Sequence, residues 1–324
     1  MAAAHILPVV AEAPEAAQIA AEVLERTAAE TTPVANVTGA FSFNQDVLSP
    51  SDDIFSIFGT AVTGVCAKPA FAISGTQENV ENHYVNVYGN MKYNFSVSLD
   101  ELKDKEITRS MACSCAMGEA IINASVTGVP LSAIVEMADL DADVNTVTVK
   151  GSDGYGLPMP LTYALEQQAM LVYRINGQPL PENQRTQLWM PGMAAQYFTR
   201  DVADIMLSVS DKEPAIKEVP AEHRAKVAIV NYFGDAAAPA GQPMTFEGYA
   251  DDFGKAITAV EFSMDGGATW TAYETAGATS DRWVYWTFTY TPEEAGVYEL
   301  QVRAVAEDGT VSPLASSLVF SVSK

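Results

Sequence analysis

The chain has 324 residues, of which 48% are hydrophobic, and it lacks the uninterrupted apolar run of about 18 residues that a membrane-spanning helix needs. We therefore expect a soluble chain with no membrane span, long enough for two domains with ordinary cores. Its 41 acidic and 18 basic residues give a formal charge of −23, which argues against nucleic acid or an anionic membrane as a partner. Three cysteines, Cys66, Cys113 and Cys115, are too few and too unevenly spaced for a disulfide scaffold.

The first residues are not typical of a signal peptide. The start, MAAAHILPVVAEAPEAAQ, has a short apolar run, but no basic segment precedes it. Residues 13–30 then place apolar side chains at helical spacing in an Ala- and Glu-rich background, which predicts an amphipathic helix or an acidic arm. We assign residues 1–35 to this arm and expect a signal peptide to be absent or already removed.

The next informative stretch predicts a strand, a turn, a second strand and a short helix. Residues 83–88 alternate between apolar and polar faces, Gly89-Asn90 is a turn signal, and residues 99–102 have the composition of a short helix. A further helix is predicted at residues 131–140. The Asn176-Gly177 pair then predicts a tight hairpin between two strands.

Residues 106–131 are the stretch around which we expect a functional site. A strand-like run ends on Cys113 and leads into a loop that contains Gly and Asn residues. A lone thiolate is a suitable ligand for a soft metal, and Cys115 lies on the same face of an extended segment as a second candidate. The alternative interpretation of Cys113 is a small buried apolar residue.

From Lys226 onward, short alternating strands recur at intervals of about ten residues, which is typical of a β-sandwich. Asp265-Gly266-Gly267 predicts a hairpin turn, and residues 297–309 alternate between apolar and polar side chains. We interpret Trp270 and Trp286 as residues of the sandwich core.

Four motifs together resemble the sulfite oxidase family of molybdenum enzymes, over roughly residues 80–324. The first two are the Ser-Leu-Asp-Glu-Leu stretch at residues 98–102 and the E-I-T-x-x-[LM]-x-C strand at residues 106–113, which ends on Cys113. The third consists of G-x-D-G-Y at residues 151–155 and N-G-x-P-L-P at residues 176–181. The fourth is the [LV]-x-x-P-G strand and loop at residues 188–192, and the loop that begins at its proline, residues 191–201, is called the P-G loop below. In addition, SxDGGxTW at residues 263–270 resembles the immunoglobulin-like C-terminal domain of the same enzymes.

The resemblance implies an α+β chain. A sulfite oxidase-type mixed α/β cofactor domain would occupy residues 36–212, a linker residues 213–225, and an all-β immunoglobulin-like sandwich residues 226–324. In that family the last domain makes the dimer contact, so a homodimer is expected. Many members are exported, and we expect an exported or cell-envelope location here.

The same resemblance implies a set of site residues. Cys113 would bind molybdenum, with the remaining sulfurs supplied by the dithiolene of the pterin. Tyr155 would orient a substrate oxygen, or it would pack as a loop aromatic; the residues leave both interpretations open. Asp153 is expected to cap its turn. The implied cofactor-binding residues are Cys113, Ser114, Gly118, Asn123, Asp153, Gly192 and Arg200.

The chain departs from the family in its cations. Gly118 stands where sulfite-oxidising members have an Arg, and residues 193–197 of the P-G loop carry no charge, so Arg200 alone matches a family cation there. A charge-assisted hydrogen bond to a buried anion is worth about 1.5 to 3 kcal/mol, so losing three or four would weaken cofactor capture by several orders of magnitude. Sulfite is therefore not the expected substrate.

Three hypotheses follow. The first is a molybdopterin-dependent oxidoreductase that acts on a neutral or cationic small molecule and passes electrons to a separate protein, because no haem or flavin motif is present. The second is a non-catalytic descendant that serves as a binding or structural module. The third is a site repurposed for another metal or for thiol chemistry through Cys113 and Cys115. We favour the first over the second, and both over the third.

Overall fold

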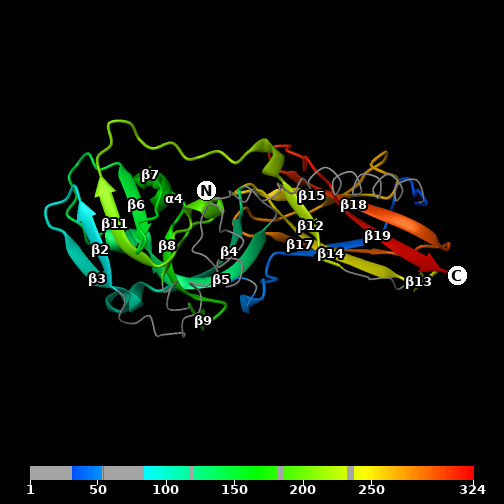
Figure 1. The fold of residues 1–324 in the computed structure, drawn as a ribbon, viewed down its shortest axis with the longest axis horizontal. Coiled ribbons are helices and arrows are strands. Elements are labelled where there is room, and N and C mark those ends of the chain that lie inside the picture. Colours follow the sequence, from blue (N-terminus) through cyan, green and yellow to red (C-terminus); the bar gives the residue numbers. More distant parts are fainter. Residues whose placement is uncertain (1–30, 53, 55–83, 117–119, 181–185, 232–236) are drawn as a thin grey trace, which may run out of the picture.

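A computed structural model describes residues 31–52, 54, 84–116, 120–180, 186–231 and 237–324. Two β-rich units lie end to end in an elongated molecule, and the chain that follows β11 connects them along one side (Figure 1). The helix predicted at residues 13–30 lies outside the described residues, as do Cys66 and Gly118.

The first unit is built from two sheets whose buried faces share one hydrophobic core. One sheet has the order β3-β2-β11-β6-β7, and the other has the order β10-β8-β5-β4 with β9 paired to β8. The strands are β2 (Tyr84–Gly89), β3 (Phe95–Ser98), β4 (Ile107–Ser114), β5 (Ile121–Pro130), β6 (Thr146–Gly151), β7 (Pro158–Pro160), β8 (Met170–Ile175), β9 (Gln178–Pro179), β10 (Gln187–Trp189) and β11 (Val202–Ser208).

Local sequence explains several turns and ends of this unit. The helix η4 (Leu99–Lys105) begins at Ser98, which forms a capping box with Glu101, so the Ser-Leu-Asp-Glu-Leu motif is a helix start. Asn176 and Gly177 have φ values of 51° and 77°, as a type I′ turn requires, which confirms the predicted hairpin between β8 and β9.

Helices are few and short in the described part of the first unit. The helices α3 (Leu131–Val135) and α4 (Leu161–Glu166) have five and six residues, and η6 (Ala195–Tyr197) and η7 (Ala221–His223) have three each. Predicted helices at 99–102 and 131–140 are confirmed in position, although α3 is shorter than expected. The predicted α+β class therefore holds in a strongly β-rich form.

The second unit is a sandwich of two sheets, called the sandwich below. One sheet has the order β1-β17-β14-β12, and the other has the order β13-β19-β18-β15-β16. The strands are β1 (Ala40–Asn44), β12 (Lys226–Ile229), β13 (Ala238–Pro239), β14 (Met244–Asp251), β15 (Ile257–Ser263), β16 (Thr271–Glu274), β17 (Val284–Tyr290), β18 (Gly296–Ala306) and β19 (Ser316–Ser323).

Aromatic side chains from both sheets fill the sandwich core. Phe262 of β15 stacks on Phe288 of β17 with ring centroids 4.2 Å apart, and Trp286 contacts Phe262 edge to face. Trp286 is fully buried, which confirms its predicted core position. Trp270 instead lies half-buried at the β15–β16 hairpin, under the guanidinium of Arg303 at 4.0 Å, so its prediction as a core residue is wrong.

The strand β1 belongs to the sandwich, which differs from the predicted division of the chain. Residues 40–44 were assigned to the cofactor domain, but they pair antiparallel with β17 and form an edge of the sandwich. Phe41 packs on Tyr273 with ring centroids 5.1 Å apart, so this short strand adds apolar surface to the second core. The alternation of β1 was visible in the sequence, but its partner lies more than 200 residues away.

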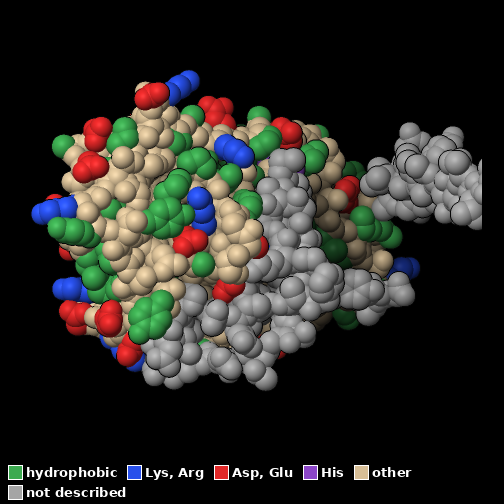
Figure 2. Space-filling model, turned by 60° about the vertical axis from the view of Figure 1, so that its left-hand side comes forward, with side chains coloured by type: hydrophobic (Ala, Val, Ile, Leu, Met, Phe, Trp, Pro, Cys, Tyr) green, Lys and Arg blue, Asp and Glu red, His purple; other side chains and the backbone are tan. Residues whose placement is uncertain are grey.

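Charged side chains are dispersed over the face shown in Figure 2, where Asp and Glu (red) alternate with Lys and Arg (blue) on the first unit. Within the described ranges, every helix is too short or too polar to cross a bilayer.

We predict that Trp286→Ala lowers the free energy of unfolding by about 3 to 5 kcal/mol, because it leaves a large cavity in a packed core. The control is Val319→Ala, at a position 41% exposed in the same sandwich, for which we expect about 0.5 kcal/mol or less. Urea unfolding followed by far-UV circular dichroism measures both changes. Equal losses would contradict the assigned core.

Candidate functional site

The P-G loop, residues 191–201, is the place where the predicted site motifs meet. Ala194 forms an isolated parallel bridge with Ser114, which places the loop beside the end of β4. The hydroxyl of Tyr155 donates to the carbonyl oxygen of Gln196 at 2.6 Å. Ser114 and Tyr155 lie 80 and 41 positions before their partners in this loop, so motifs that are distant in sequence meet there.

The turn that carries Tyr155 also rests on the far end of this loop. The amide of Ser152 donates to the carbonyl of Asp201 at 2.9 Å, and Gly151 has no room for a side chain because a Cβ would lie 2.5 Å from the carbonyl oxygen of Arg200. Asp153 accepts a hydrogen bond from the amide of Tyr155 at 3.0 Å. Asp153 thus caps its turn, as expected from the residue type.

Cys113 lies at the end of β4 with its side chain toward the core of the first unit. The residue is 5% exposed and belongs to the same hydrophobic cluster as Met111, two residues earlier in the strand. Ser114 points to the other face, as alternation in a strand requires. Cys115 is partly exposed, and its amide donates to the carbonyl of Ala120.

Asn123 does not lie on the face of Cys113. It pairs with Ala112 across the sheet, so its side chain projects from the opposite face. Its amide group donates to the carbonyl oxygens of Gln45 and Val47, both at 2.9 Å, and its Oδ1 is buried with no hydrogen-bond partner among the described residues. Asn123 therefore holds the segment that includes residues 45–49, and its cofactor role stays a prediction.

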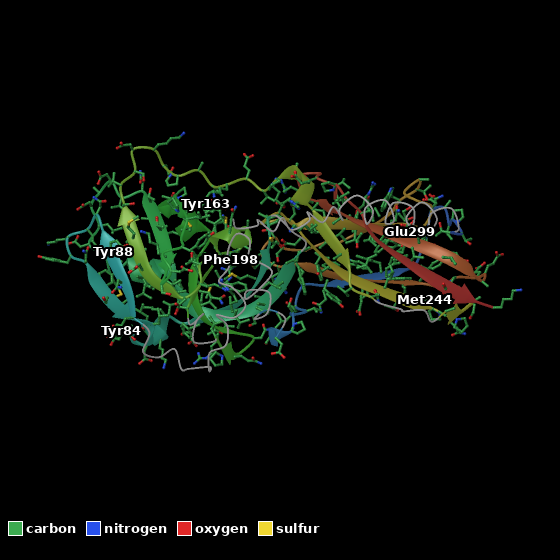
Figure 3. All side chains as sticks on the ribbon, viewed as in Figure 1. Tyr84, Tyr88, Tyr163, Phe198, Met244 and Glu299 are labelled. Atoms are coloured by element: carbon green, nitrogen blue, oxygen red, sulfur yellow. The ribbon has the colours of Figure 1, made fainter. Side chains whose placement is uncertain are left out.

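Apolar and aromatic side chains occupy most of the P-G loop. Tyr197 is buried, and its hydroxyl accepts a hydrogen bond from the amide of Lys217 at 2.9 Å. Phe198, which Figure 3 labels in the first unit, contacts Trp189 edge to face. Arg200 is 7% exposed, and it bridges to Gln187 through the backbone. The loop is thus held by core packing, and Arg200 is its buried cation.

Gly192 is required by the contact between the two units. Its φ is 71°, and a Cβ there would lie 2.7 Å from the Cα of Gly254, at the tip of the β14–β15 turn (residues 251–255). The backbones of the loop and of this turn therefore touch. Gly192 therefore serves the packing of the sandwich against the loop, and its cofactor role stays a prediction.

Two buried charged residues of the sandwich were missed by sequence reasoning. Ser114 donates to the carboxylate of Asp251 at 2.5 Å, and the ammonium of Lys226 donates to the carbonyl oxygen of Cys115. Burial raises the pKa of the Asp251 carboxyl, and the hydrogen bond from Ser114 counteracts this only in part. The only sequence signal of their burial was that Lys226 and Asp251 are charged residues in otherwise alternating strands.

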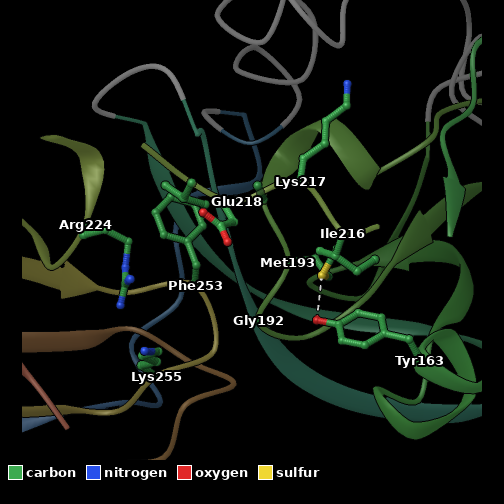
Figure 4. A pocket seen from close by; sticks show the side chains of 11 residues that line it. Tyr163, Gly192, Met193, Ile216, Lys217, Glu218, Arg224, Phe253 and Lys255 are labelled. Carbon is green, nitrogen blue, oxygen red and sulfur yellow. Dashed lines mark hydrogen bonds between the residues drawn. The ribbon is translucent and has the colours of Figure 1, made fainter. Parts of the chain in front are cut away.

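A cavity of about 410 Å³ adjoins the P-G loop between the two units (Figure 4). The hydroxyl of Tyr163 points at Met193 and donates to its sulfur at 3.0 Å, and Phe253 faces the cavity from the other side. Arg224 lines the cavity but binds Asp252 through two hydrogen bonds of 2.6 and 2.5 Å. Lys217 and Lys255 also line the cavity, and Lys255 is paired with Asp308, so two of these three cations already bind carboxylates.

Part of the chain is similar to known molybdopterin proteins. Residues 72–214 match the family described as oxidoreductase molybdopterin binding domain. Mitochondrial sulfite oxidase of Homo sapiens is 28% identical over 196 residues, which are 49% of this chain and 35% of that protein. Sulfite oxidase of Gallus gallus is 27% identical over 210 residues, which are 54% of this chain and 43% of that protein.

The fold agrees with that of a solved structure. The sulfane dehydrogenase SoxCD from Paracoccus pantotrophus superimposes with a TM-score of 0.60 at 18% identity, over 95% of this chain and 86% of that chain. The chain thus carries a molybdopterin-binding domain of the oxidoreductase type. The comparisons support a relation to the sulfite oxidase-type molybdopterin oxidoreductases, and the chain spans less than half the length of the curated relatives named above.

The described residues fit this cofactor in their donor chemistry. A molybdenum pterin takes one soft ligand from the protein, and the Cys113 sulfur at the strand end is of that kind. Arg200 supplies a buried positive charge in the adjacent loop. Among the described residues, no three His, Cys, Asp or Glu side chains converge on a single point.

We predict that Gly192→Ala destabilises the protein more than Gly177→Ala does. Both glycines have similar left-handed backbones, φ 71° and 77°, and each substitution should cost about 1 to 2 kcal/mol for that reason. Only at Gly192 would the new Cβ also collide with Gly254, which should add about 1 to 3 kcal/mol. Urea unfolding compares the two variants, and indistinguishable losses would disprove the backbone contact.

Proposed function

We propose that this protein is a molybdopterin-dependent oxidoreductase that uses Cys113 as the thiolate ligand of molybdenum. The observation that carries the proposal is the convergence of the β4 end, the Tyr155 turn and the P-G loop, in a chain of this family. The substrate that we propose is a neutral or cationic small molecule. The implied electron acceptor is a separate protein.

Each residue has a defined task in this proposal. Cys113 presents a sulfur at the end of a paired strand, where the backbone on either side is held by hydrogen bonds. The Tyr155 hydroxyl, which now donates to Gln196, can turn to a substrate oxygen at the cost of one hydrogen bond. When bound, the molybdenum cofactor would supply the redox chemistry that these side chains lack.

The charge of the site supports a substrate that is not an anion. The P-G loop bears Tyr197 and Phe198 as buried aromatic side chains, and an aromatic ring does not replace the charge-assisted bonds that an anionic substrate needs. The chain as a whole carries a formal charge of −23, which also repels anions at a distance.

A second candidate function is a non-catalytic module that keeps the fold without the cofactor. The 5% exposure of Cys113 and its place in the core cluster favour this candidate, because a thiol that packs among apolar side chains is chemically inert. Association through the sandwich, as a homodimer, is compatible with both candidates. An exported or cell-envelope location likewise stays a prediction.

We predict about one molybdenum and one pterin per chain in protein purified from a host that makes the cofactor. Cys113→Ser should lose most of the metal, because a hydroxyl is a poor ligand for a soft metal. Cys115→Ser is the matched control, two residues away, and should keep it. Elemental analysis and the fluorescence of released pterin measure both.

Absence of metal and pterin from the unsubstituted protein would favour the non-catalytic module. Loss of metal from Cys115→Ser, with Cys113→Ser unaffected, would point to a repurposed site at the second cysteine.

A further inference from the structure

We propose that the sandwich completes the cofactor site by fixing the strand that carries Cys113, with Asp251, Lys226 and Asp281 as positioning residues. The proposal rests on the proposed function, and it assigns to the sandwich a task beyond association. Three contacts carry it. Each reaches β4 or the residue that follows it.

The first contact closes the open edge of β4. This strand is the last of its sheet and pairs along one side with β5. On its other side, the amide of Ala112 donates to the carbonyl oxygen of Asp281 at 2.8 Å, from the chain segment just before β17. Arg109 adds an ion pair to the Asp281 carboxylate at 3.5 Å. The sandwich therefore holds the backbone on the N-terminal side of Cys113.

The second contact is the hydrogen bond between Ser114 and Asp251. Both residues are buried, at 1% and 5% exposure, so the bond is shielded from water. Asp251 is the last residue of β14, and its carboxylate also accepts the amide of Phe253 at 3.3 Å. The side chain that follows Cys113 is thus tied to the sandwich.

The third contact places a buried cation beside the same segment. Lys226 is 6% exposed, pairs with Asp251 across the strands β12 and β14, and lies 5.2 Å from the centre of the Phe253 ring. Its ammonium donates to the carbonyl oxygen of Cys115. A lysine in such a place is stable only when these groups compensate its lost hydration.

Together the contacts hold the chain on both sides of Cys113. They explain why burial along β4 rises from exposed residues at its start to four buried residues, 111–114, at its end. The same β14–β15 turn also meets Gly192 of the P-G loop through Gly254. One turn of the sandwich therefore sets the position of the Cys113 strand relative to the loop that carries Arg200.

The first test uses full-length protein prepared without cofactor. Lys226→Met removes the ammonium and keeps most of the side chain, so we expect backbone hydrogen exchange in residues 107–116 to accelerate about tenfold or more, as follows from the loss of one charge-assisted bond. The control is Arg303→Met, which breaks a 2.5 Å ion pair with Glu261 inside the sandwich and should leave this segment unchanged. Equal exchange in the two variants would overturn the proposal.

The second test uses protein loaded with cofactor. Lys226→Met should retain several-fold less molybdenum after gel filtration than Arg303→Met, and Lys226→Arg should recover part of it because the guanidinium can still donate to Cys115. If Lys226→Met does not fold, hydrogen exchange of the unsubstituted protein with and without cofactor tests the proposal instead. Loading should then slow exchange in residues 251–255 together with residues 107–116, and no change in residues 251–255 would overturn the proposal.

These outcomes separate the two proposals. If Cys113→Ser keeps its metal, the proposed function fails, while the exchange result on cofactor-free Lys226→Met still shows whether the sandwich holds β4. If Cys113→Ser loses its metal and Lys226→Met behaves as Arg303→Met in both tests, the positioning role fails and the proposed function stands.

Discussion

The hydrogen bond from Ser114 to the buried carboxylate of Asp251 is the interaction on which the arrangement of this molecule depends. A carboxylate without water needs donors, and Asp251 finds them in Ser114 of the first unit and in its own turn. The bond can form only if the sandwich seats closely, which Gly192 and Gly254 permit by offering no side chains. Close seating in turn lets the Lys226 ammonium reach Cys115. The contact between the two units therefore determines the geometry around Cys113.

Local parts of this structure could be predicted because their causes are local. The SxDGGxTW motif shows the reason: Asp265 accepts the amide and the hydroxyl of Thr269 at 2.9 and 2.6 Å, and these bonds lower the pKa of its carboxyl. All partners lie within four residues, so residue types at fixed spacing suffice to identify the turn. The capping box at Ser98 and the turn at Asn176-Gly177 were predictable for the same reason.

The parts that escaped prediction depend on distant partners. Ser114 and Asp251 are 137 positions apart, and Lys226 and Cys115 are 111 apart. Lys226 looks like an ordinary first residue of an exposed strand, and a charged residue in an alternating strand is a weak signal of burial. The face on which Asn123 lies could not be predicted, because the register between β4 and β5 decides which side chains share the face of Cys113.

The distribution of positive charge gives the site its particular character. The P-G loop places Tyr197 and Phe198 in the core, where an apolar side chain gains from burial and a cation would lose hydration. Lys226 brings its charge from the other unit, to a carbonyl oxygen two residues from Cys113. Asp251 stands across from Lys226 on the neighbouring strand, so a buried acidic group accompanies this cation. A site of this kind orients its ligand by backbone geometry more than by charge, so loosening the sandwich would disturb it even if no residue of the first unit were substituted.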